Sequence, residues 1–360
     1  MSTVHVIAMD THSRTTSICV KTRVDGPAQH YCVATTIPAI REVIDQVRRP
    51  RHLTFEEGPL AGWLLRNLRD QVDQAIVCDP RKNAYIAKDG DKDDPIDAAK
   101  LCDLHLGGLL RAVHHPESLG REVLRQTVGL YHERVQHRVR CANKIMGRLK
   151  RWGVMAREKD FAPAAGRALV LAELAEAVGG TRERQTIGEH LELLLRGYDD
   201  ARAAERQMHR TLERCAAADP QAVRWMAVPG IGPVRAVTLL AVLDTPWRFK
   251  SKSALCKYLG IGLARRRSGQ QKPVLKVEQA ANPLLRNIIL GAAMSVLQHY
   301  PHSVLHQQYQ RWIAAGQSPK NARRNLARRL AATLWGMWKN GGTYDEQLVG
   351  AAAPDRDGAA

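Results

Sequence analysis

Short apolar runs rich in β-branched residues recur through the first 112 residues, and their order limits the fold more than any other feature of the chain. Runs of this length, each bounded by turn residues, are typical of buried strands. Helical apolar spacing begins at Pro38, again around Leu60, and a third time through Ala98, Leu101 and Leu104. The strand-like runs lie at 4–10, 16–20, 30–36, 52–55 and 74–78. We therefore expect three strands, a helix, a strand, a helix, a strand and a helix, in that order.

This order predicts an α/β domain with a ribonuclease-H-like fold, in which helices cover both faces of one sheet. From about Glu117 the spacing changes to that of long helices, and two stretches fit a heptad pattern with Arg138 and Glu205 as exceptions. Their apolar a and d residues are Leu124, Val128, Tyr131, Val135, Ala142, Ile145 and Leu149, then Leu191, Leu194, Tyr198, Ala201, Met208, Leu212 and Cys215. We expect an antiparallel coiled-coil hairpin whose two arms separate near Gly179-Gly180. It either packs within one chain or pairs with a second copy.

The chain is therefore expected to combine α/β and all-α parts. The ribonuclease-H-like domain spans 1–112 and the helical coiled-coil hairpin spans 113–218. A mostly helical C-terminal domain with a helix-hairpin-helix-like motif spans 219–346. The remaining residues, 347–360, are rich in Ala, Gly, Asp and Pro, a composition typical of a disordered tail.

Positive charge is concentrated in the C-terminal domain. The whole chain has a formal net charge of +18, and residues 221–340 contain 19 Lys and Arg against two acids, Asp244 and Glu278. Five tryptophans lie among these cations: Trp225, Trp247, Trp312, Trp335 and Trp338. Such a basic block is the usual footprint of nucleic-acid binding. Improved solubility and binding to an anionic membrane are the alternatives, but no helix with a bulky apolar face indicates the latter.

Two features within this block favour contact with phosphates. Gly230-Ile231-Gly232 forms a short turn before a helix, where backbone N–H groups are suited to a phosphate, although such turns also serve as plain connections. Further on, Arg323, Arg324, Arg328 and Arg329 lie on one side of an expected helix, with leucines on the other. These arginines either contact nucleic acid or form an ordinary solvated face.

The cysteines and the hydropathy pattern narrow the class of protein. The seven cysteines are scattered and never form a Cys-x-x-Cys pair, which argues against a disulfide framework and a zinc site. No apolar run approaches the roughly 18 residues of a membrane span, and the N-terminus lacks a signal-peptide pattern. We expect a cytoplasmic, nucleoid-associated protein without membrane contact.

Four carboxylates stand at the ends of the expected elements. Asp10 ends the first strand, Glu56 ends the fourth, and Asp94 and Asp97 begin the helix after the fifth. The first and fourth strands are neighbours in a ribonuclease-H-like sheet, so these carboxylates converge and need a cation such as Mg²⁺ or Mn²⁺. The alternative for Asp94 and Asp97 is purely structural, as an N-cap and an N3 residue of the helix around Pro95.

These residues also carry a family resemblance. Three blocks resemble the Asp, Glu and Asp-x-x-Asp blocks of the DEDD transposases of the insertion-sequence 110/1111 family: Ile7-Ala8-Met9-Asp10, Phe55-Glu56-Glu57-Gly58-Pro59 and Lys92-Asp93-Asp94-Pro95-Ile96-Asp97-Ala98. Further blocks resemble the C-terminal domain of these transposases: Pro229-Gly230-Ile231-Gly232-Pro233 through Phe249-Lys250-Ser251, Tyr258-Leu259-Gly260, Ser268-Gly269 and Asn282-Pro283-Leu284-Leu285-Arg286. Glu57 and Asp93 depart from the family pattern, and each could compete with its neighbour, Glu56 or Asp94, as a ligand.

The resemblance implies a DNA transposase or recombinase. In this family the four carboxylates bind Mg²⁺, and a serine that matches Ser268 attacks a DNA phosphodiester to form a covalent phosphoserine. The family also uses a noncoding bridge RNA that pairs with double-stranded donor and target DNA, and it acts as a homo-oligomer, a dimer or a tetramer. We expect nucleic acid to contact Gly230, Gly232, Arg265, Arg266, Arg267, Lys272, Arg286, Arg323 and Arg324. The alternatives are a metal-dependent nuclease or Holliday-junction resolvase, in which water attacks, and a nucleic-acid-binding protein without catalysis.

Overall fold

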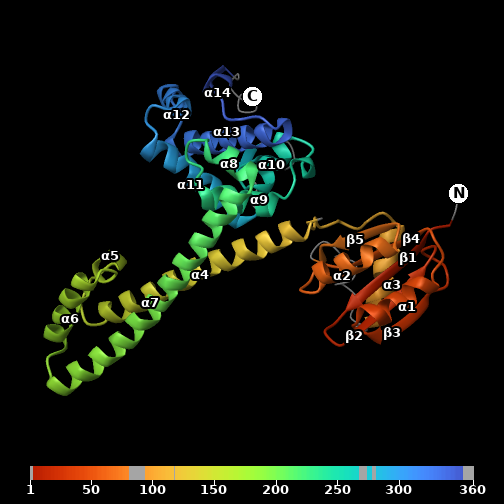
Figure 1. The fold of residues 1–360 in the computed structure, drawn as a ribbon, viewed down its shortest axis with the longest axis horizontal. Coiled ribbons are helices and arrows are strands. Elements are labelled where there is room, and N and C mark those ends of the chain that lie inside the picture. The colour runs from red at the N-terminus through yellow and green to blue at the C-terminus, as the bar shows by residue number, and fades with distance from the viewer. Residues whose placement is uncertain (1–2, 81–93, 117, 267–273, 278–280, 352–360) are drawn as a thin grey trace. The chain divides into compact units, whose positions relative to one another are not determined.

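The computed structural model of the 360-residue chain describes residues 3–80, 94–116, 118–266, 274–277 and 281–351 (Figure 1). For Asp94, 264–266, 274–277 and 350–351 the description is limited to the backbone. The chain divides into two compact units, Met1–Pro116 and Glu117–Ala360, and each is described by itself.

The first unit is a five-stranded sheet with helices on both faces. Its strands are β1 (His5–Thr11), β2 (Thr15–Lys21), β3 (Gln29–Ala34), β4 (Arg51–Glu56) and β5 (Gln74–Cys78), and its helices are α1 (Ile37–Gln46), α2 (Ala61–Leu68), the short η1 (Arg69–Gln71) and α3 (Asp94–Leu106). The spatial order is β3-β2-β1-β4-β5, with β1 antiparallel to β2 and parallel to β4. The expected sequence of elements is confirmed, and so is the pairing of the first strand with the fourth.

Alternation along β1 divides the core of this unit into two layers. Ile7 and Met9 pack in one cluster with residues of α1 and α2, whereas Val6 and Ala8 pack in another with Ala98 and its neighbours on α3. Successive side chains of a strand point to opposite faces. Helices α1 and α2 therefore cover one face of the sheet, and α3 covers the other.

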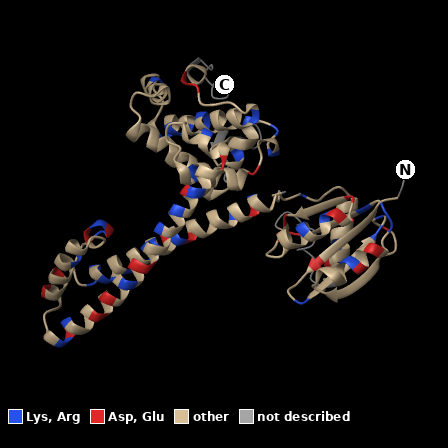
Figure 2. Ribbon diagram, in the orientation of Figure 1, with Lys and Arg blue, Asp and Glu red and all other residues tan. Residues whose placement is uncertain are grey.

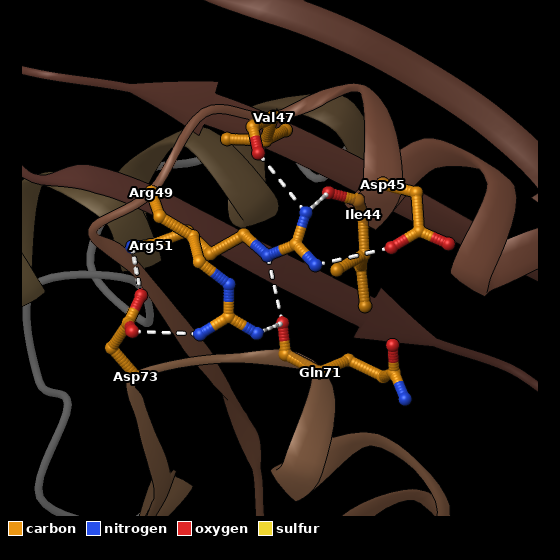
Figure 3. A network of polar contacts seen from close by, with 7 residues as sticks. All are labelled: Ile44, Asp45, Val47, Arg49, Arg51, Gln71 and Asp73. Atoms are coloured by element: carbon orange, nitrogen blue, oxygen red, sulfur yellow. Dashed lines mark hydrogen bonds and ion pairs between the residues drawn. The ribbon is translucent and has the colours of Figure 1, made fainter.

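A buried arginine fixes the start of β4 (Figure 3). The Arg51 side chain donates hydrogen bonds to the carbonyl oxygens of Ile44, of Val47 at 3.0 Å and of Gln71 at 2.7 Å, and its Nη2 lies 3.1 Å from Oδ1 of Asp45. Asp73 accepts from the Arg51 backbone N–H at 2.8 Å, a hydrogen bond that lowers the pKa of Asp73. These bonds join the end of α1 to the strand whose far end carries Glu56.

His52 and His105 form a pair that makes the first unit sensitive to acid. Nδ1 of His52 and Nε2 of His105 are 3.3 Å apart. Burial, and secondly the charge of His52, lower the pKa of His105 from 6.5 to about 4. Because the unfolded chain binds this proton first, the stability that neutral His105 provides is full above about pH 6.5 and is lost as the pH falls toward 4.

We therefore expect the His105→Gln variant to lose less stability than the unaltered chain between pH 6.5 and pH 4. Urea unfolding followed across this range gives the measurement, and the pH dependence rather than the absolute stability is the readout. His30→Gln, at an exposed histidine of β3, is the control and should keep the original pH dependence. An identical pH dependence in the His105→Gln variant would contradict the assignment.

The second unit begins with a long antiparallel hairpin of helices (Figure 1). Helices α4 (Leu119–Lys150) and α7 (Thr181–Ala218) pack along each other, and α5 (Glu158–Phe161) and α6 (Ala164–Val178) lie between them in sequence. Gly179-Gly180 lies directly before α7, as expected for the start of the second arm, but the two arms are also separated by α5 and α6. The first arm ends before a turn at Gly153, which has φ of +80°.

The two exceptions to the heptad pattern meet each other in the hairpin. Nε of Arg138 on α4 pairs with Glu205 on α7, and its Nη1 pairs with Glu158 of α5. Hydrogen bonds from Arg138 and from Tyr198 lower the pKa of Glu158 against the opposing effect of burial. A charged pair at these positions sets which residues of the two helices face each other, as polar groups in coiled-coil seams do.

The rest of the second unit is a helical domain with its own core. Its helices are α8 (Pro220–Met226), α9 (Pro233–Leu243), the short η3 (Pro246–Arg248), α10 (Lys252–Tyr258), α11 (Pro283–His299), α12 (Val304–Ala314), α13 (Pro319–Asn340) and α14 (Glu346–Ala351), and its strands β6 (Leu263–Arg266) and β7 (Val274–Val277) pair antiparallel. Val128 and Leu212 of the hairpin belong to the same core cluster as α9, α11 and α13. The base of the arm is thus built into this domain.

The end of the chain differs from the expectation of disorder from 347 onward. Helix α14 continues to Ala351, and Val349 packs against the core while its carbonyl oxygen accepts a hydrogen bond from Arg329. Residues 352–360 lie outside the described part. Among the residues that the structure describes, no helix is both long and apolar enough to cross a membrane.

Candidate active site

Asp10 and Glu56 lie at neighbouring strand ends of the first unit. Met9 pairs with Phe55 across the parallel strands β1 and β4, so the next residue along each strand is Asp10 or Glu56. Parallel strands are about 4.8 Å apart. Because Met9 and Phe55 face the core beneath α1 and α2, alternation places Asp10 and Glu56 on the opposite face, which α3 covers.

The direction of α3 follows from contacts near its end. The thiol of Cys102 lies 3.5 Å from the carbonyl oxygen of Val6 and 3.2 Å from that of Cys19, and the next residue, Asp103, pairs with Lys21. Val6 stands at the beginning of β1, four residues before Asp10. The end of α3 therefore lies over the start of β1, and the start of α3 extends toward the end of β1.

This direction brings the first turn of α3 toward Asp10 and Glu56. From Cys102 back to Asp97 the helix covers about 7.5 Å, and from Val6 on to Asp10 the strand covers about 13 Å. Asp97 is four residues before Leu101, a buried residue of α3, so it belongs to the helix face that packs on the sheet. Asp97 is partly buried, and the side chain of Asp94 lies outside the described part.

The donor set suits a hard divalent cation. Carboxylate oxygens from Asp10, Glu56 and Asp97 are the ligands that Mg²⁺ and Mn²⁺ prefer. Among the side chains that the structure describes, no group of three or more His, Cys, Asp or Glu is arranged to hold a metal ion, and Asp94, one of the four expected ligands, is not among those side chains.

Neighbouring side chains separate Glu56 from its competitor, Glu57. Glu57 pairs with Nε2 of His115, whose side chain is 10% exposed, and its backbone N–H donates to the carbonyl oxygen of Cys78. Glu57 thus ties β4 to the segment beyond α3. Asp10 has a basic neighbour as well, since Nε2 of His12 is 3.5 Å from its Oδ2. Asp93, the competitor of Asp94, lies outside the described residues.

The Gly-Ile-Gly turn lies between two helices of the second unit, as expected. It joins α8 to α9, with Gly232 as the N-cap of α9 and Pro233 as its first residue. Gly230 has φ of +84°, and a Cβ there would be 2.5 Å from the carbonyl oxygen of Ala292 on α11. Gly230 therefore serves close packing, whereas Gly232 has nothing within 4 Å of its Cβ position and is open to a ligand.

Two guanidinium groups lie at the start of the β6–β7 hairpin. Nη1 of Arg328 donates to the carbonyl oxygen of Ile261 at 2.9 Å. A Cβ at Gly260 would be 2.9 Å from Nε of Arg286, and this Nε is buried without a hydrogen-bond partner among the described residues. Ser268, Arg267 and Lys272 fall in the stretch between β6 and β7, outside the described residues, and the side chains of Arg265 and Arg266 are outside them too.

The basic helix α13 and the tryptophans have roles that the sequence pattern did not indicate. Arg323 and Arg324 are partly exposed, but Arg328 and Arg329 donate to backbone carbonyls of Ile261 and Val349 and help to hold the domain together. Trp225 is fully buried against Trp338. Trp335 and Trp338 also pack on the core, while Trp247 is 71% exposed. Most of these rings serve the fold, contrary to the expected interleaving on a binding surface.

Carboxylates gathered at strand ends in one unit, and a basic helical domain in the other, are the parts expected of a protein that processes nucleic acid. Residues 223–310, from α8 to α12, match the model of the Transposase IS116/IS110/IS902 family. The resemblance to insertion-sequence transposases of the 110/1111 family is thereby confirmed.

Three relatives named as transposases support this relationship. A Sinorhizobium fredii protein, y4pF/y4sB, is 23% identical over 70% of this chain and 64% of its own length. A family 20 transposase of Pseudomonas aeruginosa is 24% identical over 69% of this chain and 72% of its own length. The transposase for insertion sequence element IS1111A of Coxiella burnetii is 25% identical over 58% of this chain and 57% of its own length. Two of the three alignments thus span less than two thirds of the relative.

Proposed function

We propose that this protein is a DNA transposase that cuts and rejoins strands through Ser268, with help from the carboxylates of its ribonuclease-H-like first unit. The observation that carries the proposal is the arrangement of Asp10 and Glu56 at adjacent ends of parallel strands, on the face of the sheet that α3 covers. The match of the basic C-terminal domain to transposases supports the DNA substrate.

Each unit has a distinct part in the proposed reaction. The Ser268 hydroxyl attacks a DNA phosphorus, so that an oxygen–phosphorus bond to the protein forms and the bond to one strand breaks. The departing strand oxygen takes up a proton. The hydroxyl of a second strand end later attacks the same phosphorus, which rejoins DNA and releases Ser268. Asp10, Glu56, Asp94 and Asp97 would hold Mg²⁺ or Mn²⁺, which supplies Lewis-acid stabilisation of negative charge. Arg286 and Arg328, at the start of the hairpin that contains Ser268, can stabilise charge on the phosphate.

The partners follow from the family relationship. We propose that the DNA substrates are a donor and a target duplex, that a noncoding bridge RNA selects them, and that the active form is a homo-oligomer, a dimer or a tetramer. The concentration of basic residues in the second unit supports binding to such polyanions. Treatment with ribonuclease before addition of DNA should abolish recombination of element ends, and undiminished recombination would remove the RNA from the proposal.

Ser268→Ala should abolish the covalent link between protein and DNA. The experiment incubates the full chain with DNA that carries the ends of its own element and detects the protein–DNA adduct by denaturing gel. Ser253→Ala, an exposed serine of α10, is the matched control and should keep the adduct. An adduct in the Ser268→Ala variant would overturn the assignment of the nucleophile.

A second candidate function is a metal-dependent nuclease or junction resolvase in which water attacks. It is favoured by the location of the carboxylates in a unit that does not contain Ser268. Cleavage of DNA by Ser268→Ala, together with loss of cleavage in Asp10→Asn, would establish this alternative.

A further inference from the structure

Helix α4 carries a second concentration of positive charge, outside the region 221–340. Residues 119–151 contain nine Lys and Arg against two acids, whereas α7, its partner in the arm, contains seven of each (Figure 2). The two helices pack along each other over much of their length. A difference in charge between two packed helices indicates that the faces of α4 and α7 meet different surroundings.

Four basic residues of α4 and its C-cap residue form one stripe on the exposed side of the helix. They are His137, Arg140, Lys144, Arg148 and Arg151, and all five are exposed. Their spacing of three and four residues confines them to an arc of about 80° along about 21 Å of helix. The buried residues Ala142, Ile145 and Leu149 lie well away from this arc and face the partner helices. The stripe is therefore directed away from the core of the arm.

The four Lys and Arg of the stripe have no acidic partner among the described residues, unlike the arginines that hold the arm together. Among the described residues, Arg121 pairs with Asp219, Arg138 with Glu205 and Arg167 with Asp199. Within the same described set, no carboxylate is within ion-pair distance of Arg140, Lys144, Arg148 or Arg151. Unpaired cations in a row repel each other, and an external polyanion would remove this repulsion.

A cavity lies at the end of the stripe. Its volume is about 200 Å³, and its walls are the apolar side chains of Leu149, Leu174 and Ile187. Arg148 and Arg151 of the stripe line it as well, together with His190 and Trp152, which is 39% exposed. An apolar hollow beside an aromatic ring and two guanidinium groups has the chemistry that receives an unpaired base next to its phosphates.

We propose that this outer face of α4 is a second nucleic-acid site, in which Arg140, Lys144, Arg148 and Arg151 bind the phosphodiester backbone and the cavity beside Trp152 holds an unpaired base. The site lies outside residues 223–310, which match the family model. It goes beyond the proposed strand transfer and does not depend on Ser268 or the carboxylates.

The test measures binding by the full chain in an Asp10→Asn, Ser268→Ala background, so that no reaction interferes. The variant replaces Arg140, Lys144, Arg148 and Arg151 with Gln. The matched control replaces Arg182, Arg184, Arg196 and Arg210, four exposed arginines of α7, with the same loss of charge in the same arm. The probes are DNA and RNA duplexes, each made fully paired and with an internal loop of unpaired bases.

The α4 variant is expected to bind looped probes at least tenfold more weakly. The slope of log K against log salt should become less steep by about 3, because each of the four lost phosphate contacts contributes about 0.7 to 0.9 to it. The α7 control should change neither. Equal losses in the two variants, or no loss in either, would overturn the proposal. The comparison of DNA with RNA identifies which of the two supplies the strand.

Trp152→Ala tests the cavity separately. It should weaken binding of looped probes by roughly tenfold and leave fully paired probes unchanged, because stacking requires an unpaired base. An equal effect on both kinds of probe would overturn the base-binding part of the proposal.

Discussion

Asp10→Asn and Glu56→Gln should each reduce DNA strand cleavage by a factor on the order of 10³. Loss of one charged oxygen ligand from a Mg²⁺ site weakens charge stabilisation by about 4 kcal/mol, which corresponds to this factor. The two residues end neighbouring parallel strands, so either change affects the same proposed site. Cleavage of DNA that carries the ends of the element, measured over a series of Mg²⁺ concentrations, gives the readout.

Glu57→Gln is a control that differs from Glu56→Gln by one position. Glu57 pairs with His115 and lies outside the proposed set of ligands, so its variant should retain cleavage within a fewfold. Asp70→Asn, at an exposed acid of the same unit, controls for the loss of one charge. Full cleavage by a folded Asp10→Asn protein, or equal loss in Glu56→Gln and Glu57→Gln, would contradict a site built on Asp10 and Glu56.

The first unit could be predicted from the sequence because its strands are short, apolar and clearly bounded. Strand alternation is a local consequence of that pattern, and the pairing of β1 with β4 was expected from the order of the elements. Together they place Asp10 and Glu56 on one face. The arrangement of Asp97 depends on the direction in which α3 crosses the sheet. That direction is set by contacts distant in sequence, such as Cys102 with Val6, which no local pattern indicates.

The helical arm shows where a local pattern stops being informative. The heptads predicted the pairing of α4 with α7, and the Gly179-Gly180 pair marked the start of α7, but neither pattern indicated that α5 and α6 lie between the two arms. Arg138 and Glu205 were exceptions in their own helices, and their mutual pairing became visible once the two helices were aligned. A charged residue in one heptad seam, together with a residue of opposite charge in the other seam, could have indicated this alignment.

Charge counting over long segments concealed the distribution that matters in the arm. Outside 221–340 the charges nearly cancel, yet α4 is strongly basic and the remaining residues offset it. The tryptophans of the C-terminal domain led to a different error, because they were expected on a binding surface and most of them pack in the core. Trp225 donates through Nε1 to the carbonyl oxygen of Leu334, and Trp335 donates to that of Pro246, so an indole among cations can be a core residue with a satisfied N–H.

Gly230→Ala should lower the free energy of unfolding of the second unit by about 3 kcal/mol. A side chain at φ of +84° is strained, and its Cβ would be 2.5 Å from the carbonyl oxygen of Ala292 and 2.9 Å from Cγ2 of Val296. Neither neighbour can move easily, because Ala292 and Val296 are fully buried in α11. Urea unfolding followed by tryptophan fluorescence measures the loss, since Trp225 lies in the same core.

Gly232→Ala, two residues further along the same turn, separates packing from binding. Gly232 has φ of −90°, and its Cβ would meet nothing within 4 Å, so the loss of stability should stay below about 1 kcal/mol. If the N-terminus of α9 receives a phosphate, this added methyl group should weaken binding of duplex DNA while unfolding is nearly unchanged. Equal destabilisation by the two substitutions would contradict the packing role of Gly230. Unchanged DNA binding by Gly232→Ala would leave the turn as a connection between α8 and α9, and nucleic-acid contact would then rest on the arginines.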